Sequence, residues 1–189
     1  MFERAMMSRM QGSACLLAAL MLAGSPLRAQ SVEAVASQYL DAMRTGDWTA
    51  MAQLMHPNAL RDLRAFLEPA LRAPSGEEFR AQFLGLTSAD EALALSDTAV
   101  FARFVQFFTE QNPTVAQALA TAEIEVVGHV PEGADTVHVV YRMRMTVMGT
   151  PVSRMDVFSL ARSGGTWRGL LKGDMSAMAN ALQRAFGGP

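Results

Sequence analysis

The chain has 189 residues, of which 50% are hydrophobic, and a formal net charge of −2 at pH 7. This balance excludes the strong basic excess that nucleic-acid-binding domains present to phosphates. The single cysteine, Cys15, lies near the N-terminus, so the residues that follow it can form neither a disulfide nor a thiol site. Such a chain has to stabilise itself by burying an apolar core, and its length is sufficient for that.

Residues 1–29 have the pattern of a secretory signal peptide. Arg4 and Arg9 make the start positive, an unbroken apolar run covers 14–23, and Ala29 offers a small residue for cleavage. The alternative is a membrane anchor, but a spanning helix needs about 20 apolar residues. We therefore expect an exported protein, periplasmic or extracellular, without a membrane span after cleavage.

The mature part, residues 30–189, is predicted to be one α+β domain whose first half is helical. Apolar residues recur there at spacings of three and four, which is typical of one buried helix face. Gly46 ends the first helix and Asp47 caps the second. In the first helix, the apolar residues at spacings of three and four are Val32, Val35, Ala36, Tyr39, Leu40 and Met43. Residues 59–121 are predicted to form a long helical middle segment.

The second half alternates apolar and polar residues, which predicts a four-stranded antiparallel meander over 122–172. The turns are predicted at 131–134, 149–150 and 164–165, the last two as two-residue hairpin loops. A short C-terminal helix is predicted to begin at Asp174.

These turns set a register that places the apolar side chains on one face. The predicted pairs are Ile124 with Tyr141, Val126 with Val139, Tyr141 with Phe158, Met143 with Asp156, Met145 with Arg154, Phe158 with Leu171, Leu160 with Gly169, and Arg162 with Trp167. The opposite face is predicted to hold Glu123, Glu125, His138, Arg142, Arg144, Arg168 and Lys172, with Glu123 opposite Arg142. This polar face is either a solvated surface or a contact surface for anionic lipid or a partner.

Three short motifs resemble the NTF2-like (ketosteroid-isomerase-like, cystatin-like cone) superfamily. They are YLDAMRTGDW at 39–48, LMHPNA at 54–59 and GTWRGL at 165–170. The resemblance implies helices packed on a curved antiparallel sheet. The long helical segment and the helical ending depart from the family pattern. The ending, Trp167 to Phe186, is more distantly similar to the periplasmic phospholipid carriers of the Mla pathway.

Asp156 is the main candidate for chemistry, because the register places it on the apolar face near Tyr141. Burial there raises the pKa of a carboxyl group. The resemblance to ketosteroid isomerase implies a general base at such a position, with Tyr141 as hydrogen-bond donor. Alternatively, Arg154 pairs with Asp156, or Asp156 lies at an open rim, and Tyr141 only packs its ring.

The predicted function is non-catalytic binding of an apolar or amphipathic small molecule, without a cofactor. One alternative is a cofactor-free isomerase-like or hydrolase-like enzyme that uses Asp156 as base. Another is a structural or protein-interaction module whose cone is filled by its own side chains. Curved sheets of this kind often pair, so a homodimer is also expected. The predicted ligand-binding residues are Tyr39, Trp48, Tyr141, Met143, Arg154, Asp156, Phe158 and Trp167.

The three histidines predict no metal site. His56 precedes a proline and is expected to have a structural role at a helix end. His129 and His138 are predicted on the polar face, with Val127 opposite His138, and lack further ligands for zinc. The serines and threonines have no base that the sequence places beside them.

Overall fold

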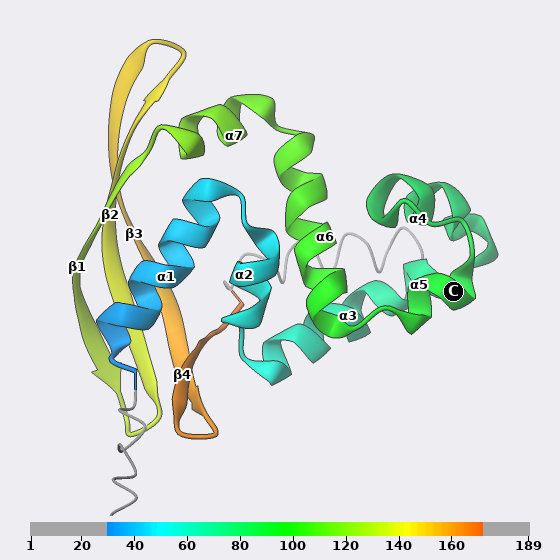
Figure 1. Cartoon of the computed structure of the whole chain (residues 1–189), viewed down its shortest axis with the longest axis horizontal. Coiled ribbons are helices and arrows are strands. Elements are labelled where there is room, and N and C mark those ends of the chain that lie inside the picture. Colours follow the sequence, from blue (N-terminus) through cyan, green and yellow to red (C-terminus); the bar gives the residue numbers. More distant parts are fainter. Residues whose placement is uncertain (1–29, 172–189) are drawn as a thin grey trace, which may run out of the picture.

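The computed structural model describes residues 30–171, and it confirms the predicted α+β fold, in which helices precede a four-stranded antiparallel sheet (Figure 1). The helices are α1 Val32–Thr45, α2 Trp48–Gln53, α3 Pro57–Arg72, the 3-10 helix η1 Pro74–Gly76, α4 Glu77–Leu84, α5 Ala89–Ala94, α6 Asp97–Glu110 and α7 Pro113–Ala120. The strands are β1 Glu123–Glu132, β2 Thr136–Val147, β3 Thr150–Ser163 and β4 Thr166–Gly169, in the order β1-β2-β3-β4. Lys172 and the predicted C-terminal helix lie outside the described residues.

The helix ends are set by capping residues that the sequence supplies. Gly46 adopts a left-handed conformation (φ 70°) and ends α1, a conformation that costs glycine little because it has no Cβ. The Asp47 side chain then accepts a hydrogen bond of 2.9 Å from the Ala50 N–H and starts α2. His56 caps α3 by accepting from the Asn58 N–H at 3.1 Å, a helix-end role. No described helix is long and apolar enough to cross a membrane.

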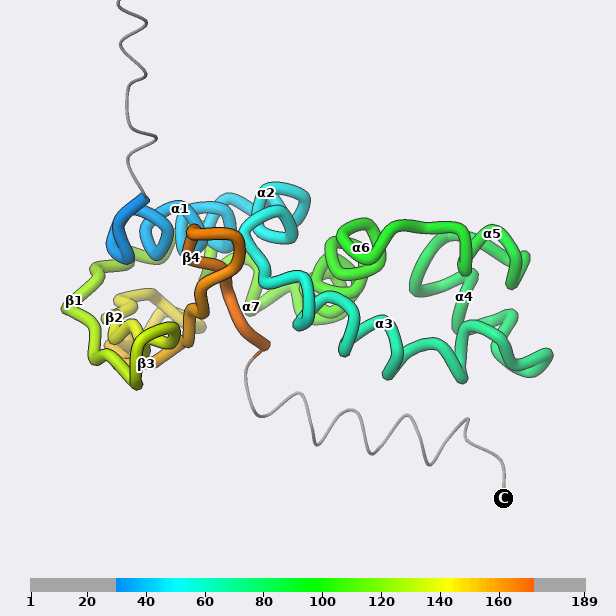
Figure 2. The backbone as a smooth tube through the Cα atoms, turned by 90° about the horizontal axis from the view of Figure 1, so that it is seen from below, coloured from blue at the N-terminus to red at the C-terminus, as the bar shows by residue number. Residues whose placement is uncertain are grey.

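Helices α3, α4, α5 and α6 extend away from the sheet and form an arm (Figure 2). Within the arm, Arg80 of α4 joins the end of α3 to the loop after α4, and its charged side chain is only 5% exposed. Its guanidinium donates to the carbonyl oxygens of Thr87, Leu71 and Ala73 at 2.9, 3.0 and 2.8 Å. A buried charge is tolerated when its hydrogen bonds are satisfied in this way.

The sheet has an inner face, which packs against α1, and an opposite outer face. The inner face carries the buried side chains Val137, Val139, Tyr141, Met143, Phe158 and Leu160. At the sheet edge, Gly169 bridges to Met55, and its carbonyl accepts from the His56 N–H at 2.7 Å. A Cβ on Gly169 would lie 3.1 Å from the Met55 sulfur and 3.4 Å from the Tyr39 ring, so glycine allows this close approach.

The first predicted turn is wrong in its position. Glu132 pairs with Thr136, so the loop is 133–135 instead of 131–134. A β-bulge at Val127 then shifts the register, and Ile124 lies opposite Met143 instead of Tyr141. The bulge inserts one unpaired residue, so the residues on its two sides alternate in opposite phase.

The second predicted turn is displaced by one residue along the chain. Met148 and Gly149 occupy it with φ values of 51° and 81°, the signature of a type I′ hairpin turn. Tyr141 therefore pairs with Asp156, Met143 with Arg154, and Met145 with Val152, each two residues from the predicted partner. A shift of two keeps every side chain on its predicted face.

The third turn agrees with its prediction. Leu160 pairs with Gly169, and Arg162 pairs with Trp167, across Gly164 and Gly165. The named ladder ends at the Leu160–Gly169 pair, so the predicted pairing of Phe158 with Leu171 lies beyond β4.

Candidate functional site

Three aromatic rings from α1, β2 and β3 form a closed cluster on the inner face. Tyr39 stacks on Phe158 with ring centroids 4.8 Å apart, and Tyr141 meets Phe158 edge to face at 5.8 Å. Their exposed fractions are 8%, 3% and 2% for Tyr39, Phe158 and Tyr141. Together the three rings fill the space between α1 and the sheet.

Asp156 lies at the polar end of this aromatic cluster, on the predicted face. Its Oδ2 accepts from the Tyr141 hydroxyl at 3.3 Å and lies 4.0 Å from the Arg154 guanidinium. Its Oδ1 accepts from the Val157 N–H at 2.8 Å. The Asp156 side chain keeps 28% exposure and that of Arg154 keeps 70%, so the carboxylate sits at a partly open rim. This geometry therefore has the features of both alternatives to a general base: Asp156 lies near Arg154, and it lies at the rim of the sheet.

Burial raises the pKa of the Tyr39 hydroxyl, and the charge of Tyr141 adds to this effect. Burial also raises the pKa of Tyr141, and the neighbouring Asp156 raises it further through its charge and its hydrogen bond. Both hydroxyls consequently stay protonated at neutral pH, and Tyr141 acts as a hydrogen-bond donor to Asp156.

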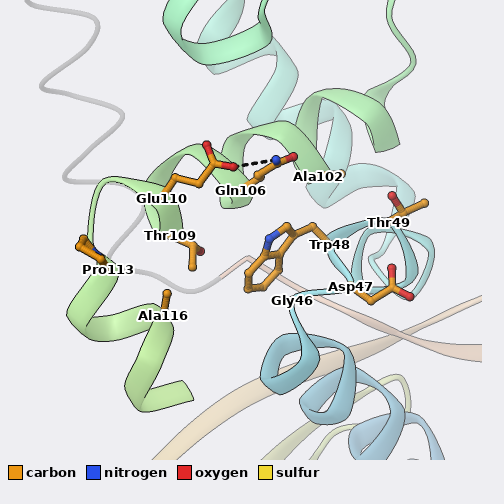
Figure 3. Close-up of a pocket in the computed structure, with 10 residues that line it drawn as sticks. All are labelled: Gly46, Asp47, Trp48, Thr49, Ala102, Gln106, Thr109, Glu110, Pro113 and Ala116. Carbon is orange, nitrogen blue, oxygen red and sulfur yellow. Dashed lines mark hydrogen bonds between the residues drawn. The ribbon is translucent and has the colours of Figure 1, made fainter. Parts of the chain in front are cut away.

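The structure separates the two tryptophans from this cluster. Trp167 lies near the β3–β4 turn, where the Arg162 guanidinium sits 4.5 Å from the ring centroid. Trp48 lies at the start of α2, facing α6 and α7 (Figure 3). Met143 and Arg154 form the next cross-strand pair beyond Tyr141 and Asp156. The eight predicted binding residues thus fall into one cluster and two outlying sites.

Trp48 lines a cavity of about 440 Å³ between the α1–α2 turn and the α6–α7 corner. Its indole projects toward Thr109 and Ala116, and the side chains of Asp47 and Thr49 point away from those two residues (Figure 3). The lining residues are Gly46, Asp47, Trp48, Thr49, Ala102, Gln106, Thr109, Glu110, Pro113 and Ala116. None of the residues of the closed aromatic cluster is among them.

The cavity wall combines apolar and polar groups. The indole, two alanine methyl groups and Pro113 supply the apolar part. On α6, the Gln106 amide donates to Glu110 Oε1 at 2.8 Å, and the Thr109 hydroxyl donates to the Val105 carbonyl at 2.8 Å. The cavity thus offers one aromatic ring for an apolar group and several polar side chains for hydrogen bonds, and it is open to solvent on one side.

The β1 bulge overturns the prediction for His129. Beyond the bulge His129 lies opposite Val139 on the inner face, where its Nδ1 is 3.0 Å from a Glu33 carboxylate oxygen of α1. Val130, not Val127, lies opposite His138. Among the residues that the structure describes, no group of three or more potential ligands is arranged to hold a metal ion.

On the outer face, Glu125 makes two ion pairs, with Arg142 at 3.1 Å and Arg144 at 3.4 Å. Glu123 lies opposite Arg144, not opposite Arg142 as predicted, because of the register shift. Arg168 on β4 donates to the Gln53 carbonyl. The basic groups described on this face are therefore largely engaged within the protein.

A chain of three polar side chains crosses the outer face and was missed by the sequence analysis. His138 Nδ1 lies 2.9 Å from the Ser159 hydroxyl, and His138 Nε2 lies 2.7 Å from Glu132 Oε2. The expectation that no serine has a base beside it is therefore wrong. The predicted register hid the contact, since it placed His138 two residues away from its partner Ser159.

A comparison with protein-family models finds no match for this chain, and a comparison with curated proteins finds none either. Among solved structures, the chain is similar to an NTF2-like protein of unknown function from Shewanella oneidensis MR-1. The two share 13% identity at a TM-score of 0.37, over 71% of this chain and 88% of the other. The name of that protein specifies no ligand, reaction or partner.

Proposed function

We propose that this chain is an exported, non-catalytic binding protein for an amphipathic small molecule, which it holds in the Trp48 cavity. The observation that carries the proposal is the half-buried indole in a cavity of about 440 Å³ with both apolar and polar walls. That volume lies within the range of small-molecule sites, about 300–1,000 Å³. Export is proposed from the signal-like pattern of residues 1–29.

The closed aromatic cluster supports this choice by contrast. Tyr39, Tyr141 and Phe158 occupy the inner face with their own rings, so the cluster is a core between α1 and the sheet. The Tyr141 hydroxyl also points at Asp156 itself. An isomerase-like site instead needs the base and the donor to reach a common substrate.

The proposal is tested with a neutral hydrophobic probe, N-phenyl-1-naphthylamine, which has one polar N–H group and whose fluorescence rises in an apolar site. We expect saturable binding of about one probe per chain, as for a single drug-sized pocket. The variant Ala116→Leu fills the cavity and should abolish this binding. Ala120→Leu, at the exposed end of the same helix, serves as the matched control. Equal binding by wild type and Ala116→Leu would refute the site.

A second candidate function is a protein-interaction module that uses the outer face. Three apolar side chains there are strongly exposed: Val130 at 57%, Met155 at 49% and Val157 at 45%. Grouped apolar exposure on a sheet face favours a partner surface, including a second copy of the chain. Light scattering measures the molecular mass of the wild type and of Val157→Lys. A dimeric wild type together with a monomeric variant supports this role. A monomeric wild type rules out a homodimer.

A further inference from the structure

The outer face carries a hydrogen-bonded row of Glu132, His138 and Ser159, one residue from each of β1, β2 and β3. His138 and Ser159 are direct cross-strand partners, and their Nδ1 and hydroxyl are 2.9 Å apart. Glu132 reaches the other ring nitrogen, Nε2, at 2.7 Å. The row therefore holds an imidazole between a hydroxyl and a carboxylate, which is the arrangement that activates a serine nucleophile.

The contact with Glu132 indicates which tautomer of a neutral His138 fits the row. A carboxylate can only accept hydrogen bonds, so Glu132 holds the His138 tautomer that carries its proton on Nε2. Nδ1 is then a lone-pair acceptor, and it faces the Ser159 hydroxyl. Glu132 acts through His138 and is a positioning residue, whereas His138 takes the proton of Ser159.

The surroundings of Ser159 are apolar and accessible. Val130 lies opposite His138 and is 57% exposed, and Val157 precedes Ser159 by two residues on the same face and is 45% exposed. Ser159 and His138 are themselves partly exposed. The two valines offer an apolar surface on which a short acyl chain can lie while its carbonyl reaches the hydroxyl.

The strand restricts the reaction that this row can support. β3 is paired with β2 and β4, and the Ser159 carbonyl accepts from the Leu170 N–H at 2.9 Å. Its backbone is engaged in the ladder and does not form the pair of free N–H groups that stabilises a tetrahedral oxyanion in efficient acyl transfer. Activated esters, whose leaving group departs easily, are then the suitable substrates.

We propose that Ser159 is an acyl acceptor, activated by His138 and positioned through Glu132, that reacts with activated esters. The Ser159 oxygen attacks the ester carbonyl while its proton passes to His138 Nδ1. The bond to the alcohol or phenol breaks, and that group leaves as an anion. Ser159 then carries the acyl group as an ester, and His138 returns its proton to water. No oxidant, reductant or metal is required.

The test uses the full-length protein and p-nitrophenyl acetate. We expect release of about one p-nitrophenolate per chain, because the acyl group stays on Ser159 and the protein is consumed as an acceptor without turnover. Peptide mass spectrometry should locate the acetyl group on Ser159. His138→Gln should slow the release by about 100-fold, the lower end of what a positioned general base contributes. Glu132→Gln should slow it less, and Glu132→Asp should restore part of the rate.

Two controls separate activation from plain surface reactivity. Ser153 lies on the same strand and face but opposite Arg144, so Ser153→Ala should leave the reaction unchanged while Ser159→Ala abolishes it. Thermal melts of all variants show whether the fold is retained. Equal labelling of Ser153 and Ser159, or an unchanged rate in a folded His138→Gln variant, would overturn the proposal.

Discussion

The closed aromatic cluster and the Trp48 cavity are built from similar parts but have opposite properties. Each combines an aromatic ring with a carboxylate: Tyr141 with Asp156 in the cluster, and Trp48 with Glu110 at the cavity. In the cluster α1 presents Tyr39 to stack on Phe158, which fills the space. At the cavity the facing positions on α6 and α7 are Ala102 and Ala116, whose small side chains leave a hollow.

The comparison shows that residue type alone does not decide between core and site. The size of the side chain on the facing element decides it, because a ring opposite a ring closes the gap and an alanine leaves it open. We therefore expect substitutions in the cluster to change the free energy of unfolding, and substitutions at the cavity to change binding.

The largest effect is expected for Phe158→Ala. This ring contacts both tyrosines and is 3% exposed, so its removal leaves a cavity in the core. We expect a loss of about 3–5 kcal/mol in the free energy of unfolding. Chemical denaturation followed by circular dichroism measures it, and a loss of under about 1 kcal/mol would show that the cluster is not part of the core.

Alkaline pH should also destabilise the cluster. Tyr39 and Tyr141 are the two tyrosines of the chain, and both have a pKa raised above the ordinary 10.0. Their contribution to stability is complete below pH 10 and is lost as pH rises above it, because the unfolded chain ionises first. Each tyrosine then removes up to about 1.4 kcal/mol per pH unit.

Tyrosinate absorbance during a pH titration measures this effect directly. The signal should stay low through the ordinary tyrosine range and rise together with the loss of circular dichroism. Ionisation of either tyrosine near pH 10 in the folded protein would show that the ring is open to solvent.

Asp47→Ala tests the border of the cavity. The substitution removes the carboxylate that accepts from the Ala50 N–H at the start of α2, so the helix that carries Trp48 loses its cap. We expect a loss of about 1 kcal/mol in the free energy of unfolding. Asp47→Asn retains an N-capping side chain and should recover most of it, as measured by denaturation. A variant without any loss would mean that α2 needs no cap.

The smallest effect on stability is expected for Trp48→Leu. The indole is half-buried and faces the cavity, so its loss should cost about 0.5 kcal/mol, as for substitutions outside the core. Binding of N-phenyl-1-naphthylamine should be lost at the same time, in a fluorescence titration. The opposite pattern, strong destabilisation with binding retained, would make Trp48 a core residue.

The sheet shows which features are predictable from the sequence. The alternation of apolar residues predicts the four strands and the inner face of β2, β3 and the first part of β1, because a side chain returns to the same face every two residues. Beyond the bulge in β1 the faces are exchanged, so His129 lies on the inner face and Val130 on the outer face. Alternation does not specify where the turns lie. Met148 takes a left-handed conformation that is rare for residues other than glycine, so the turn at Met148 and Gly149 was assigned one residue too late. The error of two in register kept the faces and changed the partners.

The error of two residues in the β2–β3 register matters most on the outer face, where it changes which side chains lie opposite each other. The cross-strand contact of His138 with Ser159 depends on the pairing of individual residues, and alternation alone does not give it. The bulge at Val127 leaves a weak signal in the sequence, Val127-Gly128, and it moved His129 to the inner face. The Trp48 cavity depends on how α6 and α7 approach α2, which no local pattern in the sequence specifies.

The most direct test of a ligand site at Trp48 is nuclear magnetic resonance of the two tryptophan indole N–H groups. N-phenyl-1-naphthylamine is titrated into the wild-type protein and into Ala116→Leu. We predict a saturable shift of the Trp48 signal in the wild type, no shift in the variant, and an unchanged Trp167 signal in both. A Trp48 signal that stays fixed while the probe binds, or one that shifts equally in Ala116→Leu, would contradict the account.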